Sequence, residues 1–137
     1  MNRVQFQKLA LVRIEEATAL FEARKYDGAY YLAGYAVECG LKACVARLTR
    51  KHDFPEKDLI KGAYTHDFET LIRTAELGTS FKHDLSGEVR LKWNWDIVKD
   101  WKEDSRYNRW TRDRARSMIE AITETPHGVL PWIKQYW

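Results

Sequence analysis

YDGAYYLAGYAVECGLKACVARLT, residues 26–49, is the stretch that decides the fold. It contains no proline and many alanines, and its apolar residues recur at steps of three and four, which predicts a long helix buried on most sides. One predicted face stacks Tyr30, Ala33, Val37, Leu41, Cys44 and Leu48. A second face stacks Tyr31, Tyr35, Glu38 and Lys42. A helix that is apolar nearly all round, with one carboxylate among tyrosines, is typical of the centre of a bundle.

Three glycines interrupt this predicted helix: Gly28, Gly34 and Gly40. Each costs about 1 kcal/mol relative to alanine in a helix interior. We therefore expect another backbone to approach the helix closely at these positions.

The preceding residues predict a first amphipathic helix over Val4–Lys25. Tyr26 and Asp27 form a tight connection, with Asp27 as a candidate N-cap of the second helix. Because tight connections make antiparallel neighbours, these two helices should form a hairpin.

The remaining chain reads as shorter helices separated by polar breaks. Residues 49–64 predict a surface loop with one short turn over residues 56–61, followed by a short helix at residues 68–77 capped by Thr65 or Asp67. Residues 79–87 read as a loop, 88–102 as a helix, 103–108 as a polar break and 110–124 as a helix, and a last short helical segment follows Pro126. No segment alternates as a strand would, so we expect an all-α, up-down helical bundle of about five helices in one domain, residues 1–137.

Composition narrows the class of protein. The 23 basic and 20 acidic residues leave a formal net charge of +3, which argues against a protein that coats nucleic acid by bulk charge. The longest apolar run, residues 29–37, is too short to span a bilayer, and the N-terminal residues have no secretory pattern. Cys39 and Cys44 point to different sides of one helix, and buried free thiols fit a reducing cytoplasm. We expect a cytoplasmic protein that does not contact a membrane.

Four blocks of the sequence resemble the HEPN family of small helical domains. YDGAYYLAGYAVECGLKA is similar to the second helix of that family, and THDFETLI, NWDIVKDWKEDSRY and HGVLPWIKQYW resemble later blocks of a bacterial branch. Together with the first helix, these blocks cover nearly the whole chain in the family's order. The resemblance implies a HEPN-like helical bundle that forms homodimers. It also implies pairing with a small nucleotidyltransferase in a toxin–antitoxin or phage-defence system.

The ribonucleases of this family use an arginine followed four to six residues later by a histidine, near the start of a late helix. Such a pair would polarise a phosphate and move a proton in metal-independent RNA cleavage. Here the spacing occurs once, at Arg47 and His52, which lie at the end of the second predicted helix instead. Residues 106–116, where the motif belongs, contain no histidine. We therefore assign no catalytic residue, and a divergent ribonuclease toxin is the alternative.

An Arg-Tyr pair, Arg106 and Tyr107, stands where that motif would start. One interpretation makes Arg106 an anion or nucleotide contact in a groove lined by Tyr35, Glu38 and Lys42. The other is a buried ion pair between Arg106 and Glu38 that joins two helices, since a buried carboxylate needs a partner. Both interpretations place these two side chains within salt-bridge distance.

The densest basic stretch holds Arg106, Arg109, Arg112, Arg114 and Arg116. On a helix, Arg109, Arg112 and Arg116 would share one face, which could track phosphates with Trp110 as a stacking platform. The alternative is a solvated helix face balanced by acidic neighbours.

Three His-Asp dipeptides, at residues 52–53, 66–67 and 83–84, invite comparison with metal phosphohydrolases. All three fall in predicted loops or at a helix start, where ligands do not converge, and His66-Asp67 is explained as capping chemistry. We predict no metal site and no cofactor.

The aromatic C-terminus, residues 129–137, either folds back over the core or forms a partner surface. The sequence thus predicts a non-catalytic binding or accessory module. Its expected partners are a second copy of the chain, a nucleotide or RNA, or a nucleotidyltransferase.

Overall fold

The computed structural model describes residues 1–49 and 53–137. Within these ranges the secondary structure is entirely helical, which confirms the predicted all-α class. The α-helices are α1 (Arg3–Glu22), α2 (Tyr26–Arg47), α3 (Lys57–Ala63), α4 (Phe68–Thr74), α5 (Gly78–Gly87), α6 (Val89–Val98), α7 (Arg112–Thr123) and α8 (Val129–Lys134), with a 3-10 helix, η1 (Glu103–Tyr107), between α6 and α7. No helix in these ranges combines the length and apolar character needed to cross a membrane.

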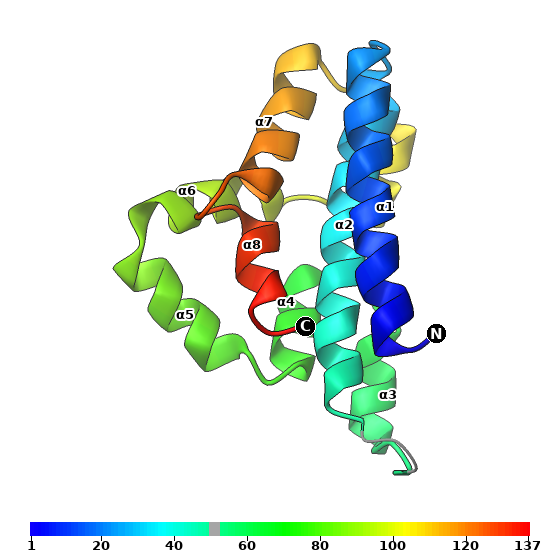
Figure 1. Ribbon diagram of the computed structural model, residues 1–137, viewed down its shortest axis with the longest axis vertical. Helices are drawn as coiled ribbons and strands as arrows, with labels where there is room; N and C mark the ends of the chain where they lie inside the picture. The colour runs from blue at the N-terminus through cyan, green and yellow to red at the C-terminus, as the bar shows by residue number, and fades with distance from the viewer. Residues whose placement is uncertain (50–52) are drawn as a thin grey trace.

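Helices α1 and α2 lie side by side and antiparallel along the long axis of the molecule (Figure 1), so the predicted hairpin is confirmed. The connection differs from the prediction, because Lys25 occupies the N-cap position of α2 and makes no side-chain cap. Asp27 lies in the first turn of α2, and its carboxylate accepts a hydrogen bond from the backbone N–H of Trp110 at 2.6 Å. The prediction of Asp27 as N-cap is therefore wrong, and this side chain joins α2 to the segment before α7.

Helix α2 is the centre of the fold, as its sequence predicts. It packs against α1, α4, α7, α8 and η1. Of the predicted inner face, Tyr30, Ala33, Val37, Leu41 and Cys44 are buried, whereas Leu48, the C-cap residue, is half-buried. The bundle builds its other elements around the sides that α1 leaves open.

Side chains, not backbones, approach the α2 glycines. A Cβ on Gly34 would lie 2.2 Å from the Trp101 indole, and one on Gly40 would lie 3.1 Å from Ile133. Trp101 in turn stacks on Phe68, with centroids 5.2 Å apart, and its indole nitrogen is buried without a hydrogen-bond partner. Gly34 therefore makes room for the residue that anchors the chain immediately before η1.

The prediction of a loop at residues 79–87 is wrong, because this stretch forms α5. Its polar, glycine-flanked sequence hides two apolar residues, of which Phe81 packs edge-on against Trp95 with ring centroids 4.8 Å apart. Asp84, on the same helix, accepts a hydrogen bond from the indole nitrogen of Trp132 at 2.9 Å. Contacts with α6 and α8 thus stabilise a helix that its own sequence specifies weakly.

The C-terminal aromatic segment folds back over the core. Val129, Leu130, Trp132 and Ile133 of α8 are buried, whereas Tyr136 and Trp137 are half-buried. Of the two alternatives for this segment, the structure shows the first.

We predict that Gly34→Ala destabilises the fold by roughly 1–3 kcal/mol, since the added methyl group overlaps the Trp101 indole and overpacks the core. Urea unfolding followed by tryptophan fluorescence measures the change. Gly78→Ala is the matched control, because a Cβ there meets no atom within 4 Å. Equal stability of the two variants would contradict the packing role of Gly34.

Candidate functional site

Glu38 is the buried charge of α2, with 2% of its surface exposed. Its Oε1 lies 2.8 Å from Lys42 Nζ and its Oε2 lies 2.9 Å from His66 Nδ1. The predicted salt bridge to Arg106 is wrong: Arg106 is exposed, and no ion pair among the described residues involves it. Lys42 reaches Glu38 from one helical turn away, and His66 supplies a second donor from the segment before α4. These two contacts provide what a buried carboxylate requires.

His66 is the member of this site that sequence reasoning missed. Its second ring nitrogen, Nε2, lies 2.7 Å from Oε2 of Glu103 in η1. Each ring nitrogen of His66 thus faces one carboxylate oxygen, so the ring bridges Glu38 and Glu103. His66 therefore ties α2 to η1, and its predicted capping role belongs to Asp67 alone, whose carboxylate accepts from Thr70 N at 2.8 Å. The hydrogen bonds from Thr70 hold the pKa of Asp67 below its ordinary value.

Two side chains near Glu38 on α2, Tyr35 and Cys39, have raised pKa values because burial disfavours their charged forms. Burial raises the pKa of Cys39 to about 12, and the negative charge of Glu38 adds to this effect. Burial likewise raises the pKa of Tyr35, with smaller contributions from Cys39 and Glu38. At neutral pH both side chains stay uncharged. This part of α2 holds a structural ion cluster, the Glu38 cluster, which consists of Glu38, Lys42, His66 and Glu103.

Five exposed arginines form a second feature, the arginine surface: Arg106, Arg109, Arg112, Arg114 and Arg116. Among the described residues, no carboxylate lies within salt-bridge distance of any of them. Aromatic rings hold most of them instead. Guanidinium carbons lie 4.8 Å from the ring centroid of Tyr107 (Arg106), 5.6 Å from that of Trp110 (Arg114), and 5.9 and 6.0 Å from that of Phe21 (Arg112 and Arg116). Acidic residues still lie beside this surface, with Asp113 in the first turn of α7 and Glu22 lining one pocket with Arg112, so a solvated helix face with acidic neighbours stays an alternative.

The arginines come from three segments rather than one helical face. Arg112 and Arg116 lie one turn apart on α7, as predicted, and both guanidinium groups lie near the ring of Phe21. Arg109 precedes the N-cap Thr111, so the prediction that it shares their helix is wrong. Arg106 belongs to η1, where interactions with the hydroxyls of Tyr107 and then Tyr31 raise its pKa.

Trp110 does not offer the free stacking platform that the sequence suggested. Its ring stacks on Tyr30 with centroids 3.6 Å apart and planes 11° apart. Its indole nitrogen donates to Ser105 O at 3.0 Å. Trp110 therefore fixes the segment between η1 and α7, whereas the neighbouring Tyr107 is 76% exposed.

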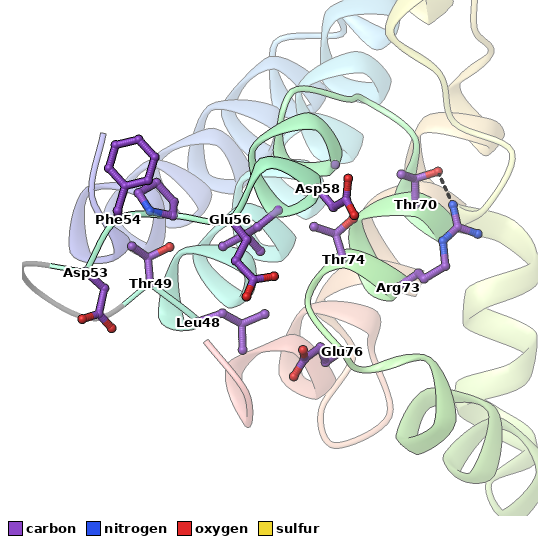
Figure 2. Close-up of a pocket in the computed structure, with 13 residues that line it drawn as sticks. Leu48, Thr49, Asp53, Phe54, Glu56, Asp58, Thr70, Arg73, Thr74 and Glu76 are labelled. Carbon is purple, nitrogen blue, oxygen red and sulfur yellow. Dashed lines mark hydrogen bonds between the residues drawn. The ribbon is translucent and has the colours of Figure 1, made fainter.

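A groove of about 850 Å³ lies at the other end of α2, between that end, α3 and α4 (Figure 2). Its charged lining is mostly acidic: Asp53, Glu56, Asp58 and Glu76. Among the described residues of the lining, Arg73 is the one basic residue, and it donates to Thr70 Oγ1 at 3.3 Å. This acidic groove and the arginine surface lie toward opposite ends of α2.

The described residues give no support to a metal site or to the Arg47–His52 ribonuclease spacing. The described residues contain no group of three or more histidine, cysteine, aspartate or glutamate side chains that could hold a metal ion. His52, which belongs to the Arg47–His52 spacing and to the first His-Asp pair, lies outside the described residues.

Comparisons with protein-family models, with curated proteins and with solved structures found no match to this chain.

We predict that Lys42→Met lowers stability by roughly 1–3 kcal/mol at pH 7, because it removes one of the two donors to buried Glu38 while keeping the apolar stem. Chemical denaturation measures the loss. Glu16→Gln is the control, since Glu16 pairs with Arg13 at 2.7 Å on the accessible side of α1, and it should change stability little. If the two variants lose equal stability, the Glu38 cluster contributes no more to the free energy of unfolding than an exposed ion pair does.

Proposed function

We propose that this chain is a non-catalytic, HEPN-like binding module that holds single-stranded RNA on the arginine surface. The observation that carries the proposal is that five exposed arginines within eleven residues have no carboxylate partner among the described residues, and that four of them lie near an aromatic ring. A guanidinium that stacks on a ring keeps its N–H donors free for phosphate oxygens. The exposed Tyr107 adds a ring on which a base can stack.

The arrangement of the arginines favours RNA over a small anion as the ligand. The arginines are distributed along eleven residues of chain, in η1, the connecting segment and α7, and do not come from a single helix face. A strand of phosphates matches a row of separated cations, whereas a single anion uses only the nearest one or two.

Fluorescence anisotropy with a labelled, single-stranded oligoribonucleotide over a range of salt concentrations tests this function. Replacing Arg109, Arg112 and Arg116 with glutamine should weaken binding about tenfold or more and make the slope of log K against log salt shallower by roughly 2. The matched control replaces Lys57, Lys61 and Arg73 with glutamine, which removes the same charge from α3 and α4. The proposal fails if the wild type does not bind, or if both triple variants lose affinity equally.

A divergent metal-independent ribonuclease is the second candidate, and one observation favours it. His66 contacts Glu103 in the same 3-10 helix that carries Arg106, so a histidine and an arginine both belong to or touch this short segment. Against it, both ring nitrogens of His66 are occupied by carboxylates. The same RNA, followed on a denaturing gel, should remain intact. Cleavage that His66→Asn or Arg106→Gln abolishes would establish the ribonuclease instead.

The homodimer and the nucleotidyltransferase partner complete the proposal. The family resemblance supports both. The α6 surface adds support for the dimer, because Val89, Trp93 and Ile97 are exposed at helical spacing on one face. Lys92, Asp96 and Lys99 provide both signs of charge beside it, which suits contact between two identical copies.

Light scattering on micromolar protein should therefore give twice the chain mass of 16.2 kDa. Trp93→Glu should return a monomer, since it introduces a charge into the apolar contact. Tyr64→Glu, which alters an exposed aromatic residue beyond the end of α3, is the control. A monomeric wild type would contradict this part of the proposal.

A further inference from the structure

A pocket of about 350 Å³ lies where the C-terminal end of α1, the start of α2 and the start of α7 meet. Phe21, Glu22, Arg24, Tyr26 and Arg112 line it. Its volume falls in the range of small-ligand sites, and its lining combines aromatic, cationic and anionic side chains. Arg112 also belongs to the arginine surface, so the pocket adjoins the surface proposed to bind RNA.

The aromatic part of the lining leaves one ring available to a ligand. The Phe21 ring is near the guanidinium groups of both Arg112 and Arg116. Tyr26 is half-buried and meets Phe21 at a tilt of 59°, with centroids 5.5 Å apart. Tyr26 is therefore the ring against which a base can stack.

The charged part of the lining has no partner of its own. Arg24, Arg112 and Glu22 are exposed, and no ion pair among the described residues includes any of them. The two guanidinium groups suit a phosphate. The Glu22 carboxylate can only accept hydrogen bonds, and ribose hydroxyls can donate them.

The backbone of Arg24 ends α1. Its φ is 62°, its N–H donates to Phe21 O at 3.0 Å, and the N–H of Lys25 donates to Leu20 O at 2.8 Å, which is a common way for a helix to end and one that glycine or asparagine favours. This turn uses only the backbone of Arg24, and its side chain lines the pocket.

We propose that this pocket binds one ribonucleotide unit, with its phosphate on Arg24 and Arg112, its base on Tyr26 and its ribose hydroxyls on Glu22. The inference rests on the proposed function and deepens it: the arginine surface follows the strand, and the pocket holds one nucleotide of it and distinguishes RNA from DNA.

Titrations with adenosine 5′-monophosphate and with its 2′-deoxy counterpart, followed by NMR shifts of amide groups, test the pocket. Arg24→Asn should weaken binding of the ribonucleotide about fivefold or more, because it removes a phosphate contact. It should leave thermal stability equal or higher, because asparagine tolerates the left-handed backbone. Glu76→Asn is the matched control, since Glu76 has a φ of 60° but lines the acidic groove at the other end of the molecule.

Glu22→Gln tests the ribose contact. The wild type should bind the ribonucleotide several-fold more tightly than the deoxynucleotide, and the variant should reduce this preference, because an amide oxygen is a weaker acceptor than a carboxylate. The pocket is overturned if the ribonucleotide does not bind, if Arg24→Asn binds it as well as the wild type, or if the wild type shows no preference for ribose.

These outcomes are separable from those of the proposed function. Oligoribonucleotide binding that depends on Arg109, Arg112 and Arg116, together with no effect of Arg24→Asn, removes the pocket and leaves the RNA-binding surface. Ribonucleotide binding that depends on Arg24, in a protein that binds no oligoribonucleotide, removes the proposed function and leaves a nucleotide pocket.

Discussion

The contact between Gly34 and Trp101 positions the segment that leads to the arginine surface. The Trp101 indole occupies the space where any residue other than glycine at position 34 would place its Cβ, and Phe68 and Tyr31 stack on this indole. Trp101 lies two residues before η1, so the contact fixes where the chain begins its path toward the arginines. His66 adds a second attachment by joining Glu38 of α2 to Glu103 of η1. Trp110, stacked on Tyr30, is the third. All three attachments end on α2, so together they hold the segment from Trp101 to Trp110 against that helix.

The sequence predicts those features that one helix determines by itself. The inner face of α2 follows from apolar spacing alone, and the hairpin with α1 follows from a short connection. The features it predicts wrongly depend on partners distant in the chain. Helix α5 has only Phe81 and Leu85 as apolar residues of consequence, and it forms because Trp95 and Trp132 meet it.

The partner of Glu38 shows the same limit at the candidate site. The requirement that a buried carboxylate have a cationic partner could be predicted from the residues around it. The identity of that partner could not be predicted. Arg106 and Lys42 both carry a suitable charge, and His66 already had a sufficient explanation as part of a helix cap. Three-dimensional arrangement assigns the cap to Asp67 and frees His66 to bridge two carboxylates.

The small net charge of the chain conceals how its charges are distributed. The acidic groove and the arginine surface lie toward opposite ends of α2, whose 22 residues span about 33 Å. The Debye length at physiological ionic strength is about 8 Å, so carboxylates at one end contribute almost nothing to the potential at the other. The potential near the arginine surface is therefore set by the five arginines and by the carboxylates beside them, such as Asp113 and Glu22, and not by the net charge of the whole chain. The net charge of +3 is too small for the whole molecule to coat nucleic acid, but it does not describe the local charge at the arginine surface.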